Sequence, residues 1–167
     1  MNKHPYETLT LRNGAKLIFT PCPGSKAATL DESITQLKQA GTSLLLTLMF
    51  DDEMSKNQII SLPDVCYENQ MRWIQLPIID DQAPSIAFES QWLTYKSAVL
   101  KVISNQGTVA VHCKGGTGRT GLVIALILLE NGWLIDEIIT EVQKIRPKAL
   151  INKAQLDYFK AQLRMKS

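Results

Sequence analysis

The stretch from residue 107 to residue 130, "GTVAVHCKGGTGRTGLVIALILLE", decides the fold. Its first seven residues form a short, mostly apolar run that contains β-branched residues, which is typical of a buried strand. The segment from Thr120 to Glu130 is apolar over a length that favours a helix. Glycines separate these two runs, so the chain is predicted to pass from strand to helix through a tight loop over residues 112–119.

Strand-like and helix-like segments alternate along the rest of the chain. The expected strands cover residues 6–11, 15–20, 43–50, 72–78 and 107–113, and the first two are joined by the hairpin signal Asn13-Gly14. The expected helices cover residues 31–40, 51–60, 86–104, 120–130, 135–145 and 152–163. This pattern predicts an α/β fold over residues 1–167: a single-domain three-layer sandwich whose central, mostly parallel sheet of about five strands is flanked by helices. Ligands bind at the carboxyl ends of such strands, where the loop over 112–119 falls.

The composition is that of an ordinary globular protein, with 45% apolar and 20% charged residues and a net charge of +2. No basic stripe points to nucleic acid, and the longest apolar run, residues 121–129, is too short to span a membrane. The first residues lack the apolar segment of a secretory signal, so we expect a cytoplasmic protein. Three cysteines without metal-ligand spacing favour neither a disulfide framework nor a metal site.

The glycine-rich loop allows two interpretations. From Gly116 onward its letters fit the G-x-G-x-x-G turn that binds dinucleotides. That interpretation requires a second strand ending in an acidic residue about 20 positions on, whereas the acidic residues here follow a helical pattern. A Walker A loop is excluded, because Cys113 stands where its first glycine is needed and Arg119 replaces its lysine.

The second interpretation starts from Cys113. A nucleophilic cysteine must act as a thiolate, and positive charge and a helix N-terminus both favour that form. Cys113 ends the predicted strand, and the following glycines allow backbone N–H groups to converge on one point. Arg119 stands at the start of the next helix, where its guanidinium can bind a phosphoryl group through two N–H groups.

The segment "HCKGGTGRTG" resembles the His-Cys-x5-Arg-Ser/Thr signature of the cysteine-dependent protein tyrosine and dual-specificity phosphatases. It is most similar to the small dual-specificity enzymes of the kinase-associated (cyclin-dependent kinase inhibitor) type. Two further segments support the resemblance: "PIIDDQAPS" is similar to the acid loop of these enzymes, and "IRPKALINKAQLDYF" to their C-terminal pattern.

The resemblance implies a two-step hydrolysis of a phosphate ester through a phosphocysteine, without a cofactor or a metal. Cys113 is then the nucleophile and Asp80 the general acid, because Asp80 and Pro84 match the family's spacing of acid and proline. Asp81 remains an alternative acid. The phosphate would be held by the side chain of Arg119 and by the backbone of the loop residues Lys114, Gly115, Gly116, Thr117, Gly118 and Arg119.

The resemblance also implies supporting roles. His112 would orient the loop and help to keep the thiolate, and Thr120 would donate a hydrogen bond to the cysteine sulfur. Lys114 would add positive charge at the mouth of the pocket. Cys66 is either a protective disulfide partner of an oxidised Cys113, as in some relatives, or a plain buried thiol. Gln155 lies either near the site or on the surface of a helix, and the surface position is the one we expect.

The expected partner is a phosphorylated protein or a small phosphate ester, with no nucleic acid and no membrane segment. A phosphoinositide phosphatase is an alternative, although Thr117 stands where the lipid phosphatases have a lysine. A weakly active phosphopeptide-binding module is a second alternative, but such modules usually lose the cysteine, the arginine or the acid. A rhodanese-type sulfurtransferase would need no upstream acid, so the loop carrying Asp80 disfavours it.

Overall fold

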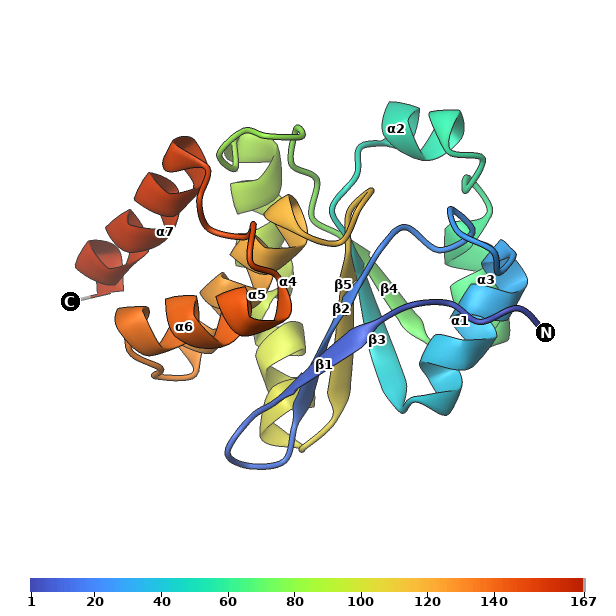
Figure 1. Ribbon diagram of the computed structural model, residues 1–167, viewed down its shortest axis with the longest axis horizontal. Coiled ribbons are helices and arrows are strands. Elements are labelled where there is room, and N and C mark those ends of the chain that lie inside the picture. The colour runs from blue at the N-terminus through green and yellow to red at the C-terminus, as the bar shows by residue number, and fades with distance from the viewer. Residues whose placement is uncertain (167) are drawn as a thin grey trace.

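A mixed sheet of five strands forms the centre of the computed structural model, which describes residues 1–166 (Figure 1). The strands are β1 (Glu7–Thr10), β2 (Lys16–Thr20), β3 (Thr42–Thr47), β4 (Arg72–Gln75) and β5 (Thr108–His112). They lie in the order β1-β2-β5-β3-β4; β1 is antiparallel to β2, and the other pairs are parallel. The central strand β5 therefore delivers residues 112–119 to the carboxyl edge, between the ends of β2 and β3.

Helices cover both faces of this sheet (Figure 1). One face carries α1 (Leu30–Gln39), α2 (Asp51–Lys56) and α3 (Leu62–Glu68). The other carries α4 (Ile86–Ser104), α5 (Gly118–Glu130), α6 (Ile135–Ile145) and α7 (Lys153–Lys166). The predicted three-layer α/β sandwich with a mostly parallel sheet is confirmed.

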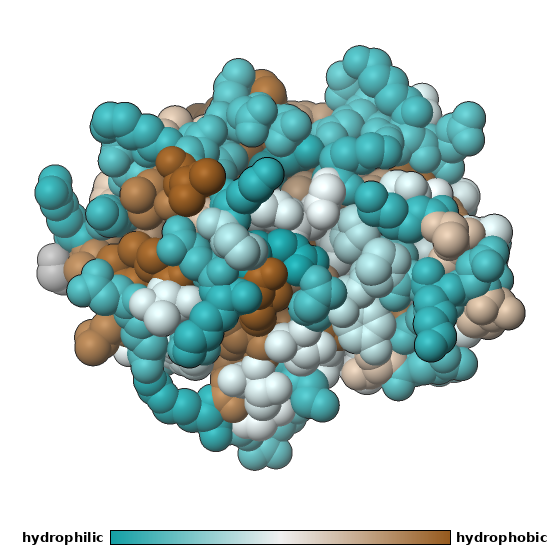
Figure 2. All heavy atoms as spheres, in the orientation of Figure 1, coloured by the Kyte–Doolittle hydropathy of each residue, from teal (hydrophilic) through white to brown (hydrophobic). Residues whose placement is uncertain are grey.

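Alternation along β5 builds two cores. Val109 and Val111 face α4 and α5, whereas Ala110 faces α1 and α3. Helix α5 is buried from Arg119 to Leu129, which explains why residues 121–129 are apolar on every side of the helix. Polar side chains cover most of the face seen in Figure 2, and apolar atoms gather near α6 and α7. None of the helices within residues 1–166 combines the length and apolar character needed to cross a bilayer.

The segment after β3 differs from the prediction. The strand expected over residues 43–50 ends at Thr47, and the helix expected over residues 51–60 ends at Lys56. Gln58 adopts a left-handed conformation with φ 58°, which a helix cannot continue. Helix α3 was not predicted; it is one short element with Pro63 in its first turn. Because β3 and α2 both end early, α2 lies next to the loop that follows β5.

Candidate functional site

The thiol of Cys113 lies at the base of the loop between β5 and α5. Its side chain is buried, and two hydrogen-bond donors point at the sulfur. The backbone N–H of Gly116 donates to Sγ over 3.3 Å, and the hydroxyl of Thr120 donates over 3.2 Å. Both donors stabilise negative charge on sulfur, which is the charge a nucleophilic thiolate carries.

The loop opens onto the N-terminus of α5. This helix begins at Gly118, and its N-cap Thr117 makes no side-chain capping bond. The first N–H groups of a helix have no partners within it, and its dipole places positive partial charge there. The stretch from Lys114 to Arg119 therefore has the local architecture of an anion site.

Gly116 is needed for the shape of this loop. It has φ +79°, and a Cβ there would lie 2.7 Å from backbone atoms of Thr20 and Pro21 at the end of β2. The neighbouring Gly115 has open space around its Cβ position. We expect Gly116→Ala to lower kcat/KM for a phosphate ester by about 10²-fold, because the backbone N–H donors of the loop must shift. Gly115→Ala should keep kcat/KM within about threefold of wild type. Steady-state kinetics on the two variants measures the difference, and equal effects would contradict this role for Gly116.

Arg119 is held by a partner that the sequence did not reveal. Its side chain is 1% exposed, and its two terminal nitrogens bind the carboxylate of Glu53 on α2 at 2.7 and 2.9 Å. Nη1 also donates to the carbonyl oxygens of Ile78, over 3.1 Å, and Leu48, over 3.4 Å. Burial alone would lower the pKa of Arg119, but its hydrogen bonds to Glu53 and the nearby negative groups outweigh burial and raise the pKa.

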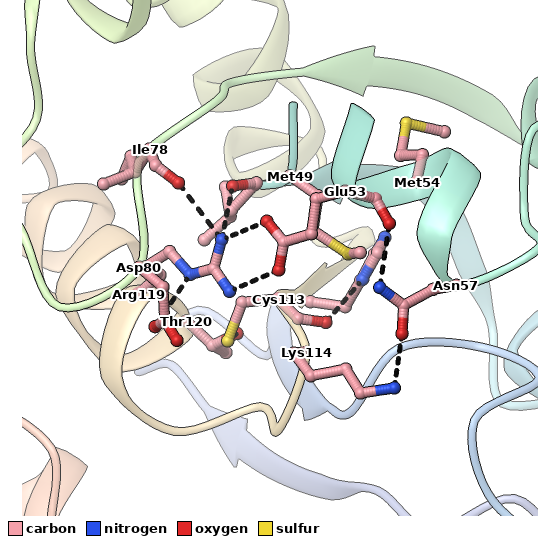
Figure 3. Close-up of polar contacts among 12 residues, drawn as sticks. Met49, Glu53, Met54, Asn57, Ile78, Asp80, Cys113, Lys114, Arg119 and Thr120 are labelled. Carbon is pink, nitrogen blue, oxygen red and sulfur yellow. Dashed lines mark hydrogen bonds and ion pairs between the residues drawn. The ribbon is translucent and has the colours of Figure 1, made fainter. Parts of the chain in front are cut away.

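These contacts leave one edge of the guanidinium available. A guanidinium has five N–H groups in a fixed fork. Glu53 and the two carbonyls occupy three of them, which leaves Nε–H and one N–H of Nη2. Within residues 1–166, Nε is a buried atom without a hydrogen-bond partner. In Figure 3, Nε points to the side away from Glu53, toward Asp80, and the guanidinium lies close to Cys113.

Of the two candidate acids, Asp80 reaches this edge. Its Oδ1 lies 3.4 Å from Nε of Arg119, within ion-pair distance but not aligned as a hydrogen bond (Figure 3). Asp81 instead occupies the left-handed region with φ 62°, a conformation that aspartate tolerates better than most residues. The structure thus brings Asp80, and not Asp81, into contact with Arg119.

His112 is fully buried beneath the loop and is neutral. Nδ1 of His112 lies 3.0 Å from the carbonyl oxygen of Cys113, which can only accept, so we assign the ring proton to Nδ1. Nε2 then accepts from the hydroxyl of Thr47 over 2.7 Å, and that hydroxyl itself accepts from Nε1 of Trp73, also over 2.7 Å. Burial lowers the pKa of His112 to about 4. His112 thus fixes the backbone of Cys113 rather than carrying charge near it.

Two further basic residues support the loop. Lys114 is exposed, but its Nζ donates to Oδ1 of Asn57 at the end of α2, so α2 is tied to the loop through both Lys114 and Arg119. Arg146 donates from Nε to the carbonyl of Gly116 over 2.9 Å and lies over the ring of Phe19. Arg146 belongs to the C-terminal segment that resembles the phosphatases, and its contact with the carbonyl of Gly116 was not predicted.

The structure corrects the expectation for Gln155 and favours one of the two alternatives for Cys66. Gln155 is not a surface residue: it is 2% exposed, and its Nε2 donates to the carbonyl of Gln82 in the loop after Asp80. Cys66 lies in the core on the α1 and α3 side of the sheet, whereas Cys113 belongs to the core on the opposite side. Both are free thiols, and burial raises the pKa of Cys66 to about 12. Cys66 is therefore the plain buried thiol of the two alternatives.

Comparison with known proteins agrees with this geometry. Residues 21–133 match a family model described as a polymorphic toxin system DSP-PTPase phosphatase. A probable protein tyrosine phosphatase type IVA B of Dictyostelium discoideum is 29% identical over 119 residues, which cover 66% of this chain and 72% of the relative. The tyrosine-protein phosphatase CDC14 of Candida albicans is 28% identical over 89 residues, which cover 53% of this chain but only 16% of the relative.

The fold has a close counterpart among solved structures. Kinase associated phosphatase, crystallised with its catalytic-site cysteine changed to serine, superposes with a TM-score of 0.84 at 21% identity, covering 99% of this chain and 96% of that one. The chain belongs to the DSP-PTPase family, and with it to the cysteine-dependent protein tyrosine and dual-specificity phosphatases.

Proposed function

We propose that the chain hydrolyses phosphate monoesters on proteins through a phosphoryl group carried on Cys113. The observation that carries the proposal is the Nε–H of the buried Arg119, which makes no hydrogen bond and lies near the thiol and beside the N-terminus of α5. A phosphoryl group accepts two parallel N–H bonds from one edge of a guanidinium. An unpartnered buried donor is costly, so an anionic ligand completes this site.

The residues divide the first step between them. The sulfur of Cys113 attacks phosphorus and the bond from phosphorus to the ester oxygen breaks, while Arg119 and the loop N–H groups hold the remaining oxygens. Asp80, protonated at the start, gives its proton to the departing oxygen. The product is a phosphocysteine and an alcohol or phenol.

The second step returns the enzyme to its starting state. Water attacks phosphorus, the carboxylate of Asp80 takes a proton from that water, and the bond between sulfur and phosphorus breaks. The hydroxyl of Thr120, 3.2 Å from Sγ, stabilises the thiolate as it leaves. Inorganic phosphate is released, and Asp80 is again protonated.

The direct test is turnover of para-nitrophenyl phosphate in the presence of EDTA. We expect metal-independent turnover, followed by activity on phosphotyrosine or phosphothreonine peptides. A folded protein without turnover that still binds vanadate would be a binding module. Preference for phosphoinositides over peptides would replace the protein substrate with a lipid one.

The general acid is tested by a matched pair of variants. We expect Asp80→Ala to lower kcat for poor leaving groups by about 10²-fold, because proton donation to the leaving oxygen is lost. Asp81→Gly should retain kcat within about twofold, because glycine adopts the left-handed conformation of residue 81 freely. Equal losses in the two variants would show that the acid is not Asp80 alone.

A further inference from the structure

The turn that carries Asp80 is tight and specific. The N–H of Gln82 donates to the carbonyl of Ile79 over 3.1 Å, which closes a four-residue turn with Asp80 second and Asp81 third. The positive φ of Asp81 is what the third residue of a type II turn requires. The direction of the Asp80 side chain therefore depends on where this turn is held.

The side chain of Asp80 makes too few contacts to fix its own position. It is 68% exposed, and within residues 1–166 its one polar contact is the misaligned 3.4 Å approach to Arg119. Exposed ion pairs contribute little to conformational preference. The position of the carboxyl group must therefore come from the backbone of the turn.

The start of α7 holds that backbone. The side-chain amide of Asn152 donates to the carbonyl of Asp81 over 3.0 Å, and that of Gln155 donates to the carbonyl of Gln82 over 3.1 Å. Oδ1 of Asn152 also accepts the N–H of Gln155 over 3.1 Å, as an N-cap does. The first turn of α7 thus binds the two carbonyl groups that directly follow Asp80 in the chain, those of Asp81 and Gln82. Figure 1 shows the start of α7 beside the loop that precedes α4.

The same turn of α7 also contacts the phosphate loop. Oε1 of Gln155 lies 3.7 Å from the position that a Cβ of Gly118 would take, at the first residue of α5. Gln155 is therefore buried between the acid turn and the anion site, and Arg119 binds the carbonyl of Ile78 on the other side of the turn. The backbone is thus held on both sides of Asp80.

We propose that Asn152 and Gln155 are positioning residues that hold the acid turn over the anion site, so that Asp80 can protonate the leaving oxygen. The inference rests on the proposed function, because it concerns the proton that Asp80 supplies. Loss of the two side-chain bonds frees the turn without touching Cys113 or Arg119. The expected defect is confined to leaving groups that need a proton.

A leaving-group series separates this role from a general structural one. Asn152→Ser keeps a capping oxygen but is too short to reach the carbonyl of Asp81, and Gln155→Met keeps the volume without a donor. Gln162→Met is the matched control, because the amide of Gln162 binds the carbonyl of Tyr158 within α7 itself. The kcat/KM of each protein is measured for aryl phosphates whose phenols range from acidic to basic.

We expect each variant to lose about tenfold for the most basic phenol and less than twofold for the most acidic, with the double variant approaching Asp80→Ala. Gln162→Met should follow wild type throughout. An unchanged slope of log kcat/KM against phenol pKa, or an equal loss for every substrate, would overturn the proposal. Failure of the phosphatase assignment is distinguishable, because wild-type protein would then hydrolyse none of the aryl phosphates, or turnover would survive in Cys113→Ser.

Discussion

Replacement of Cys113 by serine is expected to abolish turnover of para-nitrophenyl phosphate, with a loss on the order of 10⁴-fold or more. The hydroxyl is a far weaker nucleophile than a thiolate. The replacement is nearly isosteric, and the donors from Gly116 and Thr120 remain in place. The fold and the affinity for inorganic phosphate or vanadate should therefore be largely retained.

Controls for Cys113→Ser come from the same chain. Cys22 is another buried thiol close to the loop, and burial raises its pKa to about 12. The variant Cys22→Ala should therefore retain turnover. Thermal unfolding and vanadate titration show whether each variant is folded with an intact anion site. Persistent turnover in folded Cys113→Ser would contradict nucleophilic catalysis by this residue.

The second large effect is expected for Arg119→Lys, with kcat/KM reduced by about 10³-fold. A lysine ammonium has three donors around one point and lacks the planar fork of a guanidinium. It cannot bind Glu53 and the carbonyl of Ile78 while presenting two parallel N–H groups to a phosphoryl oxygen pair. The substitution therefore keeps the positive charge but removes the planar arrangement of donors.

Two comparisons locate the cause of that loss. Arg12→Lys alters an exposed arginine that pairs with Glu137 away from the site, and it should retain kcat/KM. Glu53→Gln keeps a carbonyl acceptor but loses one of two charged bonds to Arg119, so an intermediate loss of about tenfold is expected. If Arg119→Lys matched wild type while remaining folded, the two-point contact with the phosphoryl group would be wrong.

The sequence was informative where contacts are local. Cys113 and Thr120 are separated by one loop, and the hydrogen bond between them that the resemblance implied is present. Short-range signals predicted β5, α4 and α6 closely. Helix α3 was missed because seven residues show too little periodicity to be recognised.

The remaining features depend on tertiary pairing. Glu53 is an acidic residue in the first turn of a predicted helix, where any acidic residue is unremarkable, and its bond to Arg119 spans 66 positions. Gln155 was assigned to the surface because it is polar, and its burial makes sense only with the carbonyl of Gln82 opposite it. No single-sequence pattern records which distant carbonyl an amide will meet.

The central claim, that the phosphoryl group passes through the sulfur of Cys113, is tested most directly by trapping the intermediate. Wild-type protein is mixed with a radiolabelled aryl phosphate and denatured within the first turnover, and its peptides are analysed. We predict a base-stable phosphoryl group on the peptide that contains Cys113, and none on Cys113→Ser protein. Turnover by wild type with the label absent from this peptide, or found on another residue, would contradict the mechanism.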